Sequence, residues 1–131
     1  MKSLKLEPDQ KPYLAELENI LQTFEDTMTS PPNDINSQLE HLNTCNSLLA
    51  LQGRVMELAT LIHNNMKGKL IEEFKDSDED MKAHEFRLWA DGKMARWEAL
   101  YFKAERTIKS LDKYCENLRT IISAEKELSK L

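Results

Sequence analysis

Residues 90–122 read ADGKMARWEALYFKAERTIKSLDKYCENLRTII, and apolar residues recur in this stretch at alternating intervals of four and three positions. No charged residue interrupts the series, which is Ala90, Met94, Trp97, Tyr101, Ala104, Ile108, Leu111, Cys115, Leu118 and Ile122. This spacing places one apolar stripe along a single long helix, and such a stripe must be buried against other helices. The stretch therefore predicts an all-α fold in which helix packing is the central property.

The rest of the composition agrees with one helical domain spanning residues 1–131. Only three Gly and four Pro are present, and a chain of 131 residues can bury a modest core. No apolar run approaches the roughly 20 residues that cross a membrane, and residues 1–12 lack the apolar core of a signal peptide. Together with a cysteine count of two, these features predict a cytoplasmic protein that does not enter a membrane.

Charge is distributed unevenly along the chain, whose net charge is −5. Residues 1–81 carry 7 Lys/Arg against 15 Asp/Glu, whereas residues 82–131 carry 11 against 8. An acidic chain is a poor candidate for non-specific nucleic-acid binding, although its C-terminal helix alone could present a basic face.

Turn residues divide the chain into three predicted helices, which cover residues 12–29, 34–75 and 79–129. Proline suits the first position of a helix, so Pro12 begins the first one, and Pro31 and Pro32 stop it because they cannot donate a helical N–H. The second helix has a candidate capping box at Ser37 and Glu40. We expect a bend or short break in it at residues 64–68, where Asn and Gly disfavour the helix interior.

The two longer helices are joined by a short acidic turn near residue 78, so we expect them to pack antiparallel as a long helical hairpin. The short first helix should fold back at Pro31 and Pro32 and cover residues 35–50, which makes that half a three-helix bundle. The half nearest the acidic turn would then contain two helices only.

A second apolar stripe is predicted on the opposite side of the third helix, in this two-helix half. A helix with two apolar faces is buried on both, and small residues let another backbone approach closely. Two explanations are open: a homodimer or higher homo-oligomer formed through this stripe, or a break at residues 64–68 that lets the end of the second helix cover it. The predicted contact residues are Leu88, Trp89, Gly92, Ala95, Ala99 and Phe102.

Basic residues of the same helix suggest an alternative, a face that binds nucleic acid: Lys93, Arg96, Lys103, Arg106, Lys109 and Lys113. Aromatic residues lie between them, as in proteins that stack bases and neutralise phosphates. However, Trp97 and Tyr101 belong to the buried stripe, and acidic residues alternate with the cations as on a solvated, salt-bridged face. The sequence favours the solvated face.

One acidic pattern imitates the start of a calcium-binding loop, Asp76-x-Asp78-x-Asp80. Met81 and Arg87 stand where such a loop needs glycine and the closing glutamate. A solvated turn is the preferred interpretation.

Cys45, Cys115 and His41 should lie at a similar height along the hairpin, which leaves a zinc site or a disulfide as alternatives to buried thiols. Both cysteines occupy stripe positions where a small hydrophobic residue suits the packing, so buried thiols are favoured. A Gly-rich phosphate loop, a nucleophile elbow and a Glu-x-x-His pair are missing from the sequence. We expect no metal, no cofactor and no enzymatic activity.

Two segments of the last third, residues 91–101 (DGKMARWEALY) and 118–127 (LRTIISAEKE), resemble the C-terminal part of small helical proteins of tailed phages and prophages. Those proteins are encoded among early replication and recombination genes, often near a single-strand annealing recombinase. The resemblance implies an accessory protein of a mobile element with a protein partner such as a recombinase, and it implies no site residue. The leading prediction is therefore a non-enzymatic helical scaffold or accessory protein.

Overall fold

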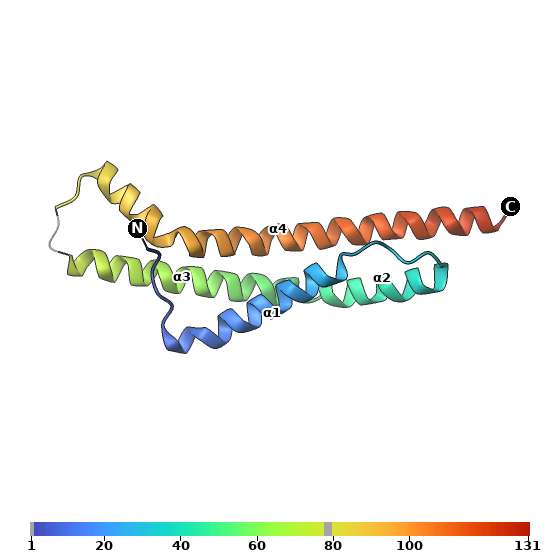
Figure 1. The fold of residues 1–131 in the computed structure, drawn as a ribbon, viewed down its shortest axis with the longest axis horizontal. Coiled ribbons are helices and arrows are strands. Elements are labelled where there is room, and N and C mark those ends of the chain that lie inside the picture. Colours follow the sequence, from blue (N-terminus) through green and yellow to red (C-terminus); the bar gives the residue numbers. More distant parts are fainter. Residues whose placement is uncertain (1, 78–79) are drawn as a thin grey trace.

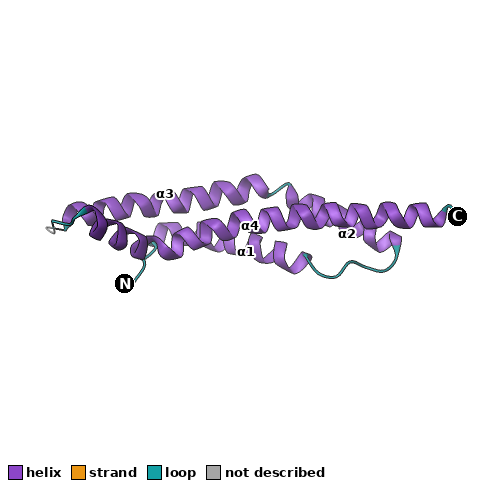
Figure 2. Cartoon of the chain, turned by 90° about the horizontal axis from the view of Figure 1, so that it is seen from above, coloured by secondary structure: helices purple, strands orange, loops and turns teal. Residues whose placement is uncertain are grey.

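The computed structural model describes residues 2–77 and 80–131. Throughout these residues the regular structure is helical, which confirms the all-α class. A 3₁₀ turn, η1 (Pro8–Gln10), is followed by α1 (Lys11–Thr27), α2 (Ile35–Leu49), α3 (Gln52–Asp76) and α4 (Ala83–Ser129). The molecule is an elongated rod, and α4 runs along its whole length (Figures 1 and 2).

α2 and α3 lie one after the other beside α4 and run antiparallel to it (Figure 1). α1 packs against α3 and α4 in the middle of the rod. One half of the rod is therefore a bundle of α1, α3 and α4, whereas the half that contains the C-terminus is built from α2 and α4.

The position of α1 differs from the one expected from the two prolines. Residues 28–34 do not form a tight turn. They continue past the end of α1 to the N-terminal end of α2, in the half of the rod that contains the C-terminus (Figure 1). As a result, α1 lies beside α3 rather than beside residues 35–50. Proline restricts itself and the residue before it to conformations that favour an extended segment, which explains why this connection extends over several residues before the chain reverses at the beginning of α2. Both oxygens of Glu16 accept hydrogen bonds from Arg54 of α3, at 2.8 and 2.7 Å, and this pairing lowers the pKa of the Glu16 carboxyl.

The expected helix 34–75 is two helices, and the break lies between Leu49 and Gln52 rather than at residues 64–68. α2 is capped by the Asp34 carboxylate, which accepts a hydrogen bond from the backbone N–H of Ser37 at 2.9 Å. α3 continues without interruption through residues 64–68. The roughly 1 kcal/mol that a helical glycine costs is outweighed there by the burial of Ile62, Met66 and Leu70.

The 4-3 stripe of α4 faces the core, as its spacing predicts. Seven of its members are buried and the remaining three, Ala90, Tyr101 and Ile108, pack against the core while partly buried. Leu17, Leu21 and Phe24 of α1 complete the core from the other side. Fully burying a side chain of this size contributes about 1.5–3 kcal/mol, so the stripe supplies much of the free energy that holds α4 in place.

The connection at residues 28–34 covers the half built from α2 and α4. The Tyr114 hydroxyl donates a hydrogen bond to the Thr29 carbonyl at 2.7 Å and lies 2.7 Å from His41 Nε2. Since the single hydroxyl proton is used on Thr29, His41 Nε2 is the donor to Tyr114. Gln38 Nε2 donates to the Pro32 carbonyl at 2.8 Å and to Glu125 at 2.9 Å. Through these bonds, residues 28–34 pack against α2 and α4 at the position that a third helix would occupy in a three-helix bundle.

Candidate helix-packing interface

The surface of α4 that faces away from the core carries five of the predicted contact residues, Leu88, Gly92, Ala95, Ala99 and Phe102, and we call this set the outer ridge. Leu88 is 59% exposed and Phe102 is 53% exposed. Ala95 and Ala99 are exposed as well, and Gly92 is partly buried. Because α3 is unbroken to Asp76, the end of that helix does not cover the outer ridge.

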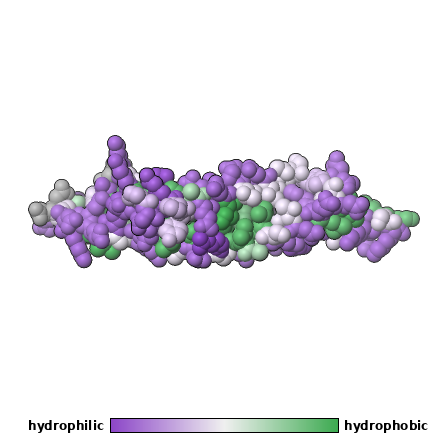
Figure 3. All heavy atoms as spheres, turned by 90° about the horizontal axis from the view of Figure 1, so that it is seen from below, coloured by the Kyte–Doolittle hydropathy of each residue, from purple (hydrophilic) through white to green (hydrophobic). Residues whose placement is uncertain are grey.

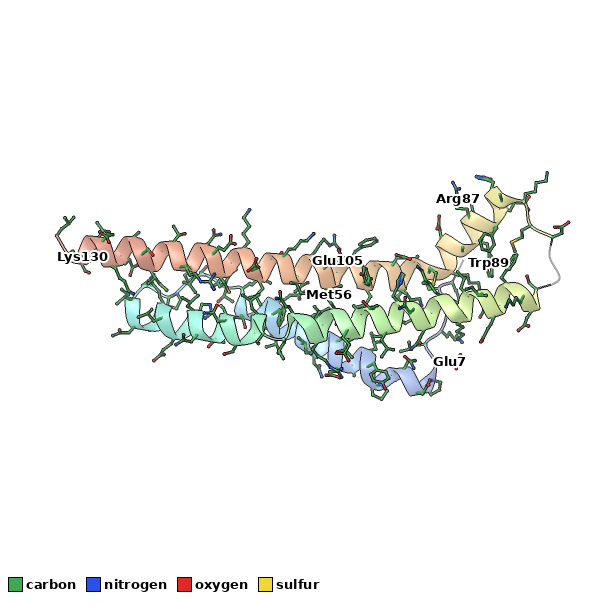
Figure 4. The ribbon with its side chains drawn as sticks, turned by 180° about the vertical axis from the view of Figure 1, so that it is seen from behind. Glu7, Met56, Arg87, Trp89, Glu105 and Lys130 are labelled. Atoms are coloured by element: carbon green, nitrogen blue, oxygen red, sulfur yellow. The ribbon has the colours of Figure 1, made fainter. Side chains whose placement is uncertain are left out.

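The sixth predicted contact residue, Trp89, lies in a different place. Its ring packs against Phe74 of α3 and against Phe86, with ring centroids 6.0 Å apart in both pairs. Phe74 and Phe86 are themselves 4.8 Å apart, edge to face. Figure 4 shows Trp89 on the side of α4 toward α3, with Arg87 pointing away from it. Trp89 therefore packs between α3 and the first turns of α4 and does not belong to the outer ridge.

An extended N-terminal segment, residues 2–6, crosses from η1 to α4, and we call it the strap. Leu4 is 3% exposed, its N–H donates to the Lys93 carbonyl at 2.9 Å, and its carbonyl accepts from Trp97 Nε1 at 2.9 Å. The Lys69 ammonium donates to the Lys5 carbonyl and pairs with Glu7 at 2.9 Å. Sequence reasoning missed the strap; its only sequence signal is an isolated pair of leucines, Leu4 and Leu6.

The strap binds α4 next to a bend. The first turns of α4, which carry Arg87 and Trp89, are inclined to the rest of the helix (Figures 1 and 4). Close to this point the backbone N–H of Arg96 lies 3.2 Å from Ser3 Oγ, an acceptor outside the helix. Groups that insert into the backbone ladder are a recognised cause of helix bending. The strap thus fixes the direction in which the first part of the outer ridge points.

The six basic residues proposed for nucleic acid do not form one face. At about 100° per residue, Lys93 and Lys109 point to nearly opposite sides of the helix. Lys93 pairs with Glu73 and Lys103 pairs with Glu25, both at 3.6 Å.

Arg96 lies over the ring of Trp97, 4.7 Å from its centroid. The remaining three, Arg106, Lys109 and Lys113, are exposed, and among the described residues no ion pair involves them. They are the cations most available for a partner.

The two cysteines are buried, reduced and adjacent in the core. Burial, together with the neighbouring Cys115 thiol, raises the pKa of Cys45 to about 12. Burial also raises the pKa of Cys115. Within residues 2–77 and 80–131, no group of three His, Cys, Asp or Glu side chains is placed to hold a metal ion. The calcium-like pattern includes Asp78, which lies outside the described residues.

Elsewhere the surface is mixed. Figure 3 shows a face that is hydrophilic for most of its length, with a hydrophobic area near the middle of the rod. On α3, Leu61 is exposed next to Glu57 and Thr60, so polar residues interrupt the apolar surface there. The outer ridge differs because only small residues separate its two large apolar side chains.

Comparison of the chain with protein-family models finds no match, and neither does comparison with curated proteins or with solved structures. Among the helices described, none combines the length and the apolar character that a membrane span requires.

Proposed function

We propose that this protein is a non-enzymatic helical scaffold or accessory protein that self-associates through the outer ridge of α4. One observation carries the proposal: Leu88 and Phe102, both more than half exposed, flank the exposed Ala95 and Ala99 and the partly buried Gly92 on the face of α4 that points away from the core. Small residues between large ones allow two helices to approach closely while the large side chains fill the space at either end.

The expected strength of this association follows from the side chains involved. Burying a Leu or Phe side chain contributes about 1.5–3 kcal/mol, and a two-fold dimer buries each of them twice. Because Leu88 and Phe102 are only 59% and 53% exposed in the single chain, the gross gain is about 3–7 kcal/mol, and it is opposed by an association cost of about 4–15 kcal/mol. Other contacts must add to the balance, and a dissociation constant in the micromolar range or weaker is the result to expect.

The resemblance of residues 91–101 and 118–127 to phage-encoded helical proteins adds a setting to the proposal: an accessory protein of a mobile element, whose protein partner would be of the recombinase class. The second candidate function, nucleic-acid binding, is supported by the exposure of Arg106, Lys109 and Lys113. Three cations would make few phosphate contacts, so such binding would be weak and would depend modestly on salt.

Sedimentation velocity from micromolar to hundreds of micromolar protein tests the proposal. The wild type should show a concentration-dependent increase in mass, and Ala95→Glu or Ala99→Arg should abolish it by placing a charge between the two helices. Ala124→Glu is the matched control, because Ala124 is exposed on the same helix outside the ridge. A wild-type protein that stays monomeric at the highest concentration would refute self-association, and unchanged circular dichroism would show that the variants remain folded.

A further inference from the structure

We infer that the outer ridge of one copy packs into a groove on α3 of a second copy, so that the two rods lie side by side and parallel. The inference rests on the proposed self-association and names the surface that receives the outer ridge. It concerns the straight part of α4 around Ala99 and Phe102, because Leu88 belongs to the inclined first turns (Figure 4).

The receiving surface is a shallow hollow of about 500 Å³ on α3, which we call the α3 groove. Its lining forms two rows in which every fourth residue takes part: Gly53, Glu57 and Leu61, and Met56, Thr60 and Asn64. Rows of this spacing form the raised lines on a helix surface, and the groove between two of them receives the side chains of another helix. The hollow is open at Gly53, where a Cβ atom would meet nothing within 4 Å.

The α3 groove faces away from α1. Arg54 follows Gly53 in the chain, points about 100° further round the helix, and pairs with Glu16 of α1 at 2.7 Å. Seen from behind, α3 and α4 lie side by side in front of α1 (Figure 4). Gly53, Thr60 and Leu61 are exposed there, so the groove is accessible to a second copy.

Phe102 and the α3 groove lie on the same face and at the same height of the rod. His63 Nε2 lies 2.8 Å from Glu98, so the groove is beside residues 98–102 of α4. The Tyr101 ring lies against His63 with centroids 5.2 Å apart, and the Phe102 ring packs edge to face with Tyr101 at 6.1 Å. Phe102 therefore stands on the α3 side of the outer ridge, next to the groove.

Equal height selects the relative direction of the two copies. A two-fold axis along the rods sets α4 of each copy against α3 of the other at unchanged height, so each Phe102 enters the α3 groove of the second copy. An axis across the rods would set α4 against α4 and α3 against α3, and the two grooves would face each other empty. Only the parallel pair places a large side chain into a hollow twice, as close packing requires.

The charges beside the α3 groove agree with this arrangement. Arg106 continues the spacing of the outer ridge one turn beyond Phe102, is exposed, and forms no ion pair within the described residues. Glu57 borders the groove at about the same height, and its contact with Arg54 at 2.9 Å leaves its side chain 68% exposed. In the parallel pair, Arg106 of each copy lies toward Glu57 of the other, and opposite charges favour this orientation.

Filling the α3 groove tests the contact. Gly53→Lys places a long charged side chain in the hollow and should raise the dimer dissociation constant at least tenfold. Gly68→Lys is the matched control: Gly68 is an exposed glycine of the same helix, and a Cβ atom there also meets nothing within 4 Å. Each glycine precedes a glutamate by four residues, Glu57 and Glu72, and both variants should keep the wild-type circular dichroism.

Energy transfer between labelled copies tests the direction. One sample of Lys130→Cys carries a donor dye and another an acceptor dye, and the two are mixed. At 1.5 Å per residue, position 130 lies about 40 Å along α4 from Phe102, so an antiparallel pair would separate the dyes by about 80 Å. The parallel pair places both dyes at one end and should give efficient transfer. Wild-type protein is the labelling control, because Cys45 and Cys115 are buried.

The outcomes separate the two hypotheses. Monomers in every sample would remove both this inference and the proposed self-association. A dimer that Ala99→Arg abolishes but Gly53→Lys leaves unchanged overturns the contact with the α3 groove alone. Equal weakening by Gly53→Lys and Gly68→Lys, or a dimer without energy transfer, overturns it as well.

Discussion

Replacing Leu4 with alanine tests whether the strap is part of the folded core. Leu4 is 3% exposed, and truncating a buried leucine to alanine costs about 2–5 kcal/mol, depending on how far the site relaxes. Because the strap is terminal and can shift toward α4, we expect about 3 kcal/mol. For a chain of this length each kcal/mol lowers Tm by roughly 3–5 °C, so Leu4→Ala should melt about 10 °C below the wild type.

Thermal unfolding followed by circular dichroism measures this loss, and tryptophan fluorescence adds a local readout. Trp97 is 1% exposed and its indole N–H is bonded to the Leu4 carbonyl, so release of the strap should shift its emission to longer wavelength. Lys2→Ala is the matched control, because Lys2 belongs to the same segment and is exposed. If Leu4→Ala melts at the same temperature as Lys2→Ala, the strap does not contribute to the fold as argued.

Two further changes concern buried polar groups. Gln38 is 1% exposed and donates a hydrogen bond to Glu125. Gln38→Glu should therefore lower the free energy of unfolding at pH 7 by about 3 kcal/mol, because it buries a second carboxylate beside that of Glu125. Gln22→Glu, which creates a similar pair with Asp26 on the surface, should cost only a few tenths, and equal losses in urea titrations would contradict the burial argument. For the thiols, a pKa of about 12 keeps Cys45 protonated in the folded state, so alkylation at pH 8 should be far slower than in denaturant. Since the folded pKa exceeds the unfolded value near 9, the stabilisation is complete below pH 9 and is lost as the pH rises toward 12; rapid native alkylation would contradict it.

The buried face of α4 could be predicted from sequence because it depends on local periodicity alone. The 4-3 spacing of Met94, Trp97, Ala104 and Leu111 defines one side of a helix wherever that helix lies, and these residues are buried. The same reasoning identified the outer ridge, whose Leu88 and Phe102 are exposed. Both predictions required only the geometry of one helix.

The neighbours of α4 could not be predicted in the same way. Pro31 and Pro32 mark the end of a helix, but how far the connecting segment extends before the chain reverses depends on where the next helix finds its contacts. At residues 64–68 the sequence predicted a bend or break in the helix, whereas α3 is continuous there. Their weak helix propensity is a matter of about 1 kcal/mol, which the tertiary burial of Met66 and Leu70 exceeds.

The sequence by itself determined the helical class, the buried stripe and the presence of a second apolar ridge, because each follows from residue spacing within one element. The tertiary structure decided where α1 packs, placed Trp89 inside an aromatic cluster, and joined the strap to Lys93 and Trp97. It also separated the cations already paired within the chain from Arg106, Lys109 and Lys113. These outcomes depend on contacts between segments far apart in the chain, whose free energies are decided by the packing of the whole molecule and leave no periodic signal in any one of them.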